Sequence, residues 1–235
     1  MSIQLPPPRS IPEPTSGVPP LESGDRLSRE EFERRYRAMP QHQKAELIQG
    51  VVYVSSPVRY EDHGNPHFDL ITWLGVYRSR TPFVEGADNV TVLLDEINEP
   101  QPDALLRLAV ERGGRSQVMG GYVEGAPEWV GEIASSSASY DLHDKFDAYL
   151  RSGVQEYLVW RVRDRAVDWF VSNADRFVPI APDADGVLRS RVFPGLWLDA
   201  AALIRRDMAG VLQVLQRGLA AAEHADFVRR LTTPE

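Results

Sequence analysis

The apolar positions along this chain fall into short runs and helical repeats rather than long uninterrupted stretches. Residues 28–31 match a helix capping box, and the apolar residues after them recur at helical spacing, which predicts a first helix ending near Pro40. The segment LIQGVVYV, residues 47–54, then places Gln49-Gly50 between two apolar pieces. This arrangement predicts a β-hairpin with its turn at Gln49-Gly50.

The middle of the chain combines helical and strand-like patterns. Apolar residues recur every three positions over 67–80, which predicts an amphipathic helix that Pro82 ends. In EWVGEIA, residues 128–134, one set of side chains alternates with another, which indicates the central strand. The first set is Trp129, Gly131 and Ile133, and the second is Val130, Glu132 and Ala134. The serines of 135–139 are expected to cap a helix that runs from about Asp141 to about Ser152 and stops at Gly153. Further strands are predicted at 90–94, 103–110, 156–162 and 166–172, with a short strand near Val118 and an edge hairpin formed by 177–180 and 188–193.

The order of these elements predicts an α/β protein of the α+β type, with a central mixed β-sheet flanked by helices. Residues 1–24 hold seven of the 18 prolines, so they are expected to form a disordered, dispensable tail. Residues 25–199 form the predicted core. The apolar repeat in 200–235 predicts a C-terminal helix, which either packs back on the sheet or pairs with a second copy in a homodimer.

The composition restricts the chemistry. The chain contains no cysteine, which excludes disulfides, thiolate zinc sites and a cysteine nucleophile, and which agrees with a cytoplasmic location. No stretch is apolar enough to predict a membrane span. A formal net charge of −8 argues against non-specific nucleic-acid binding, although basic runs such as 161–165 are present. The motifs HExxH, GxxxxGK[ST] and GxSxG are absent, which leaves little support for the hydrolase and nucleotide chemistries that use them.

Two carboxylates on neighbouring strand-like segments indicate a candidate metal site. Asp103 opens an apolar strand, and Glu132 lies in the middle of another strand, where a charge is costly unless it is paired or bound to metal. The alternatives are a turn aspartate at a strand entry and a solvent-facing glutamate. Carboxylate oxygens suit Mg²⁺, and Mg²⁺ can activate water and stabilise the leaving oxygen in phosphodiester hydrolysis.

Glu46 and Lys145 lie where they could complete such a site. Glu46 precedes the predicted hairpin, and Lys145 lies on the helix after the acid strand, one position from its apolar stripe. A lysine there could orient the water or stabilise the transition state. The alternatives are a surface glutamate paired with Lys44 or an arginine, and a solvated lysine paired with Asp141. Whether Lys145 is solvated or faces the site, Lys145→Ala is predicted to leave folding almost unchanged.

The histidines offer a weaker metal pattern. His63 and His67 are four positions apart, but Gly64, Asn65 and Pro66 stand between them. The two side chains therefore need not share a face, and the pattern alone does not support a zinc hydrolase.

Taken in order, the strings AELIQGVVYV, QPDALL, PEWVGEIASSS and DLHDKFDAYLRSGVQEYLVW resemble the Uma-two family of the restriction-endonuclease-like, PD-(D/E)xK superfamily, over roughly residues 27–203. The resemblance implies a mixed sheet flanked by helices that carries a Mg²⁺ site. By motif, Glu46 corresponds to the ELI-type glutamate, Asp103 to the aspartate of the PD step and Glu132 to the acid of the ExK element. Ala134 stands where the lysine of that element is expected. In this group the lysine is relocated to the following helix, which makes Lys145 the candidate.

The sequence therefore predicts a Mg²⁺-dependent DNA endonuclease, with Mn²⁺ as an alternative ion. Asp103 and Glu132 are the expected metal ligands, Glu46 is expected to assist the metal or its water, and Lys145 is expected to help activate the nucleophile. The alternative is a non-catalytic nucleic-acid-binding or interaction module on the same fold. The prediction requires Asp103 and Glu132 to lie on adjacent strands and on one face of the sheet.

Overall fold

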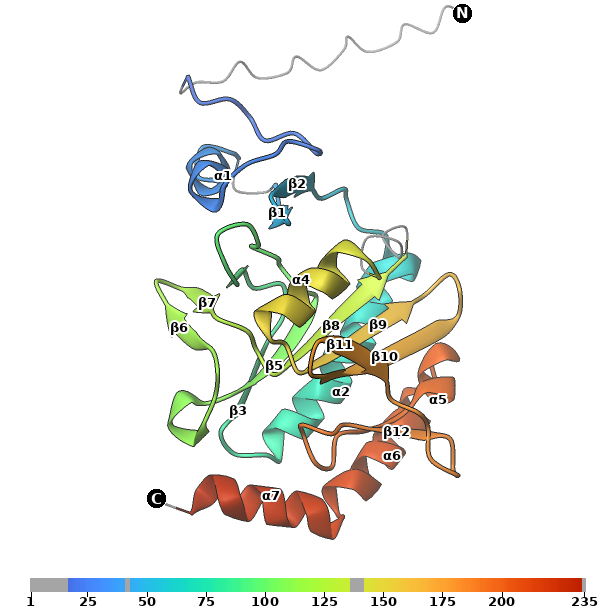
Figure 1. The fold of residues 1–235 in the computed structure, drawn as a ribbon. Coiled ribbons are helices and arrows are strands. Elements are labelled where there is room, and N and C mark those ends of the chain that lie inside the picture. The colour runs from blue at the N-terminus through green and yellow to red at the C-terminus, as the bar shows by residue number, and fades with distance from the viewer. Residues whose placement is uncertain (1–16, 41–42, 136–141, 234–235) are drawn as a thin grey trace, which may run out of the picture.

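A six-stranded mixed sheet forms the centre of the molecule (Figure 1). The structure is a computed structural model that describes residues 17–40, 43–135 and 142–233. The strand order is β11-β10-β9-β8-β5-β3, and every neighbouring pair is antiparallel except β8 and β9, which are parallel. The predicted mixed sheet is therefore confirmed. Its strands are β3 (Val84–Ala87), β5 (Ala104–Leu108), β8 (Trp129–Ala134), β9 (Glu156–Arg161), β10 (Ala166–Asn173) and β11 (Arg176–Pro179).

Helices cover both faces of this sheet. Helix α2 (Asn65–Ser79) packs on one face, and α4 (Asp144–Ser152), which connects β8 to its parallel neighbour β9, covers the other (Figure 1). Successive side chains of a strand point to opposite faces. Strand β8 thus places Trp129 and Ile133 in the core on the α2 side and the alternate residues on the α4 side. Glu132 belongs to the second set, so the predicted alternation of β8 directs this acid towards α4.

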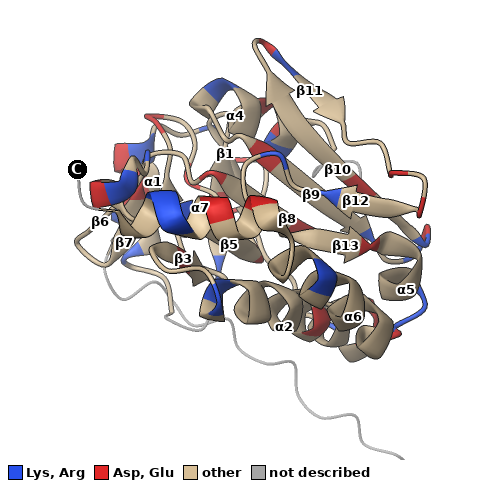
Figure 2. Ribbon diagram, turned by 90° about the horizontal axis from the view of Figure 1, so that it is seen from below, with Lys and Arg blue, Asp and Glu red and all other residues tan. Residues whose placement is uncertain are grey.

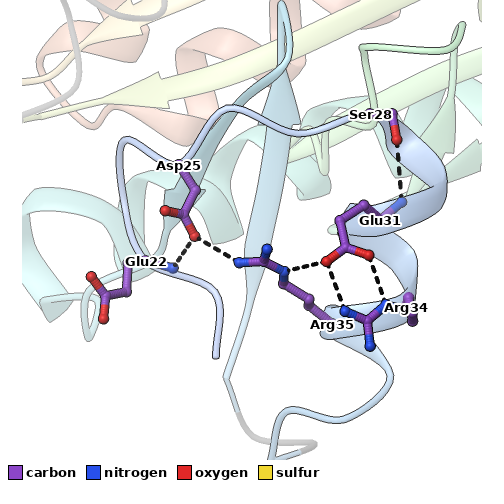
Figure 3. A network of polar contacts seen from close by, with 6 residues as sticks. All are labelled: Glu22, Asp25, Ser28, Glu31, Arg34 and Arg35. Carbon is purple, nitrogen blue, oxygen red and sulfur yellow. Dashed lines mark hydrogen bonds and ion pairs between the residues drawn. The ribbon is translucent and has the colours of Figure 1, made fainter. Parts of the chain in front are cut away.

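A small helical and hairpin unit precedes the sheet (Figure 1). Helix α1 (Arg29–Tyr36) begins after Ser28, whose hydroxyl accepts a hydrogen bond from the Glu31 N–H at 3.4 Å (Figure 3). Hydrogen bonds from Arg34 and Arg35 to the Glu31 carboxylate lower its pKa to about 2. The predicted N-terminal cap is confirmed, but the helix ends at Tyr36, before the predicted end at Pro40.

Strands β1 (Ala45–Ile48) and β2 (Val51–Val54) form the predicted antiparallel hairpin. Gln49 and Gly50 have φ values of 52° and 74°, the positive values that a two-residue type I′ turn requires. The apolar side chains of the hairpin pack against α1 in a cluster that is separate from the main core. The unit therefore has its own apolar centre.

The predicted tail is shorter than residues 1–24. Leu21 is only 6% exposed and belongs to the cluster formed by α1 and the hairpin. The Gly24 N–H donates to the Val52 carbonyl at 2.8 Å, and the Ser23 hydroxyl accepts from the Val54 N–H at 3.0 Å. Residues 21–24 thus pack on the folded chain, while residues 1–16 lie outside the described residues.

The C-terminal region packs on the α2 side of the sheet. The apolar repeat of 200–235 forms three helices rather than one, and the Asp207 carboxylate caps the second by accepting from the Gly210 N–H at 3.0 Å. The apolar residues of the last two helices join the main core, so the stripe packs on its own chain. The predicted edge hairpin is wrong, because β11 pairs with β10. The elements of this region are β12 (Val187–Arg189), which pairs with β13 (Trp197–Asp199), followed by α5 (Ala200–Ile204), α6 (Met208–Leu219) and α7 (Ala222–Thr232).

The remaining elements are short. Strand β3 has no counterpart in the prediction, because four residues with the sequence VEGA show no apolar alternation. In the described parts of the chain, no helix is long and apolar enough to cross a membrane. Acidic and basic positions are mixed along α1 and α7 (Figure 2). The short elements are the π-helical turn η1 (Tyr60–Gly64) before α2, the 3-10 turn η2 (Val110–Arg112), and a three-stranded sheet of β4 (Val92–Leu93), β6 (Gln117–Met119) and β7 (Tyr122–Glu124).

Candidate active site

Asp103 lies immediately before β5, beside the neighbouring strand β8 that carries Glu132. Strands β5 and β8 are antiparallel with Ala104 opposite Gly131, so one further step of this register sets Asp103 opposite Glu132. Directly opposed residues of an antiparallel pair point to the same face, with Cβ atoms ~4.5–5.5 Å apart. The pairing of the two neighbouring strands is confirmed, with Asp103 one residue before β5, and the shared face of the two carboxylates stays a prediction.

The Glu132 side chain is buried and held by two donors from α4. It is 4% exposed, and its Oε1 accepts from Lys145 Nζ at 2.9 Å and from Tyr149 Oη at 2.9 Å. Lys145 and Tyr149 are four residues apart, so one face of α4 presents both groups. Burial raises the pKa of the Tyr149 phenol well above its ordinary value, which keeps the phenol protonated and able to donate.

Glu46 reaches the same lysine from the N-terminal hairpin. Its Oε1 lies 2.9 Å from Lys145 Nζ and accepts from the Gln101 N–H at 2.6 Å. The ammonium group of Lys145 therefore bridges Glu46 and Glu132.

Asp144, next to Lys145 in the chain, anchors the hairpin to α4. Its carboxylate accepts from Tyr53 Oη at 2.9 Å, and its carbonyl accepts from Gln49 Nε2 at 3.2 Å. The contacts of Asp144 and Lys145 together hold the hairpin, and with it Glu46, against the helix that contacts Glu132.

Both carboxylate oxygens of Asp103 have partners. Oδ2 accepts from the Ile133 N–H at 2.7 Å, and Oδ1 lies 3.2 Å from His63 Nε2. Burial by itself would raise the pKa of this carboxyl. The contacts with His63 and the Ile133 N–H outweigh burial and hold the pKa below its ordinary value, so Asp103 is charged at neutral pH. The Asp103 carbonyl contacts His67 Nε2 at 2.7 Å.

The donor set fits a hard divalent cation. Three largely buried carboxylates, Glu46, Asp103 and Glu132, lie near Lys145, and His63 contacts Asp103. Buried carboxylates are costly unless they are paired or bound to metal, and their oxygens are the ligands that a divalent cation such as Mg²⁺ prefers. No three acids or histidines among the described residues form a ready metal cage. Mg²⁺ needs only one or two carboxylates, however, because it keeps several of its waters.

The structure changes the interpretation of Lys145 and Glu46. Lys145 is 4% exposed and paired with two carboxylates, so it is not a solvated lysine. Lys145→Ala should therefore destabilise the fold, contrary to the prediction from the sequence. Glu46 does not pair with Lys44, whose ammonium donates to Asn89 Oδ1 at 3.0 Å. The predicted partner Asp141 and the helix-capping serines of 136–139 lie outside the described residues.

Three residues that contact the acids are not among the predicted site residues: His63, which was considered only as a weak zinc pattern, Tyr149 and Gln101. The four-residue spacings from His63 to His67 and from Lys145 to Tyr149 are the patterns that could have found the first two. Indeed the rings of His63 and His67 lie together, with centroids 5.7 Å apart. Gln101 acts through its backbone N–H, which leaves no side-chain pattern in the sequence.

Comparison with known proteins gives a family and a fold. The model of the Uma2 family, described as "Putative restriction endonuclease", matches residues 29–201, which include all four candidate residues. Four chains of solved structures match. One is the crystal structure of "a putative nuclease belonging to DUF820" from Anabaena variabilis, with a TM-score of 0.56 and 14% identity over 73% of this chain and 97% of that chain. This likeness shows a shared fold, and no curated protein matches the chain. Since the family model spans most of its length, the chain belongs to the Uma2 family of restriction-endonuclease-like proteins.

Proposed function

We propose that this protein is a metal-dependent endonuclease that hydrolyses phosphodiester bonds in DNA. The observation that carries the proposal is the position of Asp103, which accepts from the Ile133 N–H next to Glu132, together with Lys145 between Glu132 and Glu46. The family to which the chain belongs supports a nuclease function. A purely structural role would give no reason to bury three carboxylates around one ammonium group.

Each residue has a distinct role in this proposal. A bound Mg²⁺ or Mn²⁺ ion would supply an activated water and neutralise charge on the leaving oxygen. Asp103 and Glu132 would hold the ion, and Glu46 would assist by accepting hydrogen bonds from its water shell. The ammonium group of Lys145 would stabilise negative charge that develops on the phosphoryl oxygens. Tyr149 keeps the Glu132 carboxylate in position by donating to Oε1.

The test is plasmid cleavage in Mg²⁺ or Mn²⁺ by the wild type, Asp103→Ala and Asp103→Asn. Removing the Asp103 charge is expected to lower cleavage by at least about 10²-fold, the scale of losing one electrostatic contact in an active site. Asp175→Asn, at an exposed aspartate in the turn after β10, is the matched control and should cleave like the wild type. Equal cleavage by the wild type and both Asp103 variants would refute the proposed site. Metal binding without any cleavage by the wild type would favour the non-catalytic module.

Exposed apolar side chains near the acids support a nucleic-acid substrate. Tyr60 and Phe68 are 69% and 71% exposed, and they lie on the same helical segment as His63 and His67. Aromatic side chains of this kind can stack on bases, with a contribution of about 1–3 kcal/mol per base. The segment also carries the exposed Arg59, which can contact phosphate.

Tyr60→Ala and Phe68→Ala are each expected to weaken the binding of a single-stranded oligonucleotide about fivefold or more, since each removes one stacking platform. Binding is measured by fluorescence anisotropy with the metal chelated, so that the oligonucleotide stays intact. Their melting temperatures should match the wild type, because the side chains are exposed. Tyr122→Ala, at an exposed aromatic of β7 in the separate three-stranded sheet, is the matched control. Equal losses at Tyr122 and at the two test positions would argue against a specific surface.

The proposal extends to assembly and location. Cutting both strands of a duplex calls for two active sites, which a homodimer would bring together. The apolar stripe of α6 and α7 is used within the chain, so a dimer contact would need another surface. A cytoplasmic location agrees with the absence of cysteine.

A further inference from the structure

We infer that the surface beside the candidate active site binds an unpaired DNA strand in preference to a duplex. Four exposed residues form this strand surface: the aromatic residues Tyr60 and Phe68, and the arginines Arg59 and Arg165. The inference rests on the nuclease site of the proposed function, and it names the class of DNA that this site takes.

The two aromatic residues lie next to the histidines that contact Asp103. Tyr60 opens the turn η1, which carries His63, and Phe68 follows His67 directly in α2. His63 Nε2 lies 3.2 Å from the Asp103 carboxylate, and His67 Nε2 contacts the Asp103 carbonyl at 2.7 Å. A nucleotide that stacks on Tyr60 or Phe68 would therefore lie beside the candidate active site.

Exposed aromatic rings stack on bases whose faces are free. In duplex DNA the successive bases of a strand are about 3.4 Å apart, so the neighbours of each base already cover both of its faces. A side chain can stack inside a duplex only after two bases have been pulled apart, which costs free energy. An unpaired strand offers its base faces without this cost. The rings of Tyr60 and Phe68, which are 69% and 71% exposed, consequently favour an unpaired strand.

The two arginines are placed to contact phosphates of a strand that stacks on these rings. Arg59 directly precedes Tyr60, and Arg165 lies in the turn between β9 and β10. An ion pair of 2.8 Å between Arg163 and Asp62 joins that turn to η1. The hydrogen bond from Arg163, and after it the charge of Arg59, hold the pKa of Asp62 below its ordinary value. Arg59 and the turn that carries Arg165 are therefore close to each other.

The charge of the strand surface suits few phosphates. Within the part of the chain that the structure describes, neither Arg59 nor Arg165 forms an ion pair, so both guanidinium groups can contact phosphate. Further phosphates would meet the exposed acid Glu61 and a chain with a formal net charge of −8. A duplex carries one charge per about 1.7 Å of its length, twice the density of a single strand. The strand surface thus lacks the cations that a duplex requires, and its affinity depends on stacking.

The depth of the candidate active site also favours a single strand. Asp103, Glu132 and Lys145 are all buried, whereas the rings of Tyr60 and Phe68 are exposed. A duplex is stiff, with a persistence length of about 150 base pairs, so bending it towards buried acids costs free energy. A single strand rotates about each of its backbone bonds. It can therefore stack on the rings and still bring one phosphodiester group to the acids.

The test compares the binding of a labelled single strand with that of a duplex of the same sequence. Binding is measured by fluorescence anisotropy with the full chain and with metal chelated. The wild type should bind the single strand about 10-fold or more tightly, since it alone gains both stacking contacts. The double variant Tyr60→Leu/Phe68→Leu keeps apolar side chains but removes the rings. Its affinity for the single strand should fall about 10-fold, and its affinity for the duplex should stay within about twofold. Tyr122→Leu, at an exposed aromatic of β7, is the matched control and should keep the preference.

The dependence of affinity on salt tests the count of phosphate contacts. For a single strand, log K falls with log salt concentration with a slope of about −0.7 per phosphate, so two contacts give about −1.4. Arg165→Gln should bring the slope to about −0.7. A wild-type slope of about −5 or steeper would need phosphate contacts that the strand surface does not provide, and it would contradict the inference.

Two other results would overturn the inference: equal affinities for single strand and duplex, or a preference that survives Tyr60→Leu/Phe68→Leu. A wild type that binds neither DNA and forms a dimer in size-exclusion chromatography would also overturn it, if the double variant is monomeric. The rings would then form a contact between two copies of the chain.

Cleavage in Mn²⁺ separates the inference from the proposed function. The wild type should cut a single-stranded circle faster than a supercoiled plasmid, and the supercoiled plasmid faster than its relaxed form, because negative supercoiling favours strand separation. If all three are cut equally and Asp103→Asn cuts none, the endonuclease stands and the inference is refuted. If the wild type prefers the single strand in binding but cuts no DNA, the strand surface stands and the endonuclease is refuted.

Discussion

Lys145→Ala is expected to lower the free energy of unfolding by about 3–5 kcal/mol, because it leaves the buried carboxylates of Glu46 and Glu132 without the ammonium group that pairs with both. The change is measured by urea unfolding followed by tryptophan fluorescence. A divalent cation should raise the unfolding midpoint of the variant more than that of the wild type, since the cation can supply part of the missing positive charge. In buffer without urea, where the variant is folded, its metal-dependent cleavage should be about 10²-fold or more below that of the wild type.

Lys44→Ala is the matched control for this experiment. Lys44 is exposed and precedes β1, so its loss should change the free energy of unfolding by no more than about 0.5 kcal/mol. Identical unfolding midpoints for Lys145→Ala and Lys44→Ala would contradict the role of Lys145 as the cation that joins the two acids. If Lys145→Ala cleaves DNA at the wild-type rate, Lys145 has no role in catalysis. The basic run of 161–165 would then be the next candidate for the catalytic cation.

Gly131→Ala is expected to destabilise the protein by about 3 kcal/mol, at the upper end of the usual cost of overpacking a core. An added Cβ would lie 2.5 Å and 2.8 Å from two ring atoms of Trp129, and 3.4 Å from a methyl group of Leu70. The Trp129 ring cannot easily yield, because it packs edge-on against Trp73 and Trp169 with centroids 6.1 and 6.4 Å away. Urea unfolding gives the size of the effect, and the near-ultraviolet circular dichroism of the tryptophans reports the repacking.

Gly75→Ala makes the same chemical change with the opposite expected sign. Gly75 lies inside α2, and no heavy atom of the described chain would come within 4 Å of an added Cβ beyond its immediate helix neighbours. Alanine favours the helix over glycine by about 0.8–1.0 kcal/mol, so this variant should be more stable than the wild type. If Gly131→Ala were as stable as Gly75→Ala, the tryptophan cluster would be looser than the structure indicates. Since Gly131 is next to Glu132, the first variant also shows how far the active site depends on the packing behind it.

Local patterns in the sequence determine several elements directly. The cap at Ser28, the Gln49-Gly50 turn and the alternation of β8 are each confirmed, because each depends on residues within a few positions of one another. The helix stop at Gly153 is confirmed for the same reason, since its φ of 94° is a left-handed conformation that glycine adopts readily. The acid motifs also fall at neighbouring strands, since Glu132 lies within β8 and Asp103 lies one residue before its partner β5.

Contacts between distant segments were decided only by the tertiary structure. The pairing of β12 with β13, the short edge strand β3 and the return of the C-terminal stripe to its own core depend on what lies beside each segment in space. The arrangement of the candidate active site also depends on contacts between distant segments. Whether Lys145 is solvated or bridges two acids depends on where the hairpin docks on α4, and whether His63 faces Asp103 depends on a π-turn that spacing does not reveal. By itself the sequence determined which side chains could bind a metal, and the packing of α4, the hairpin and η1 around two strands decided which of them meet.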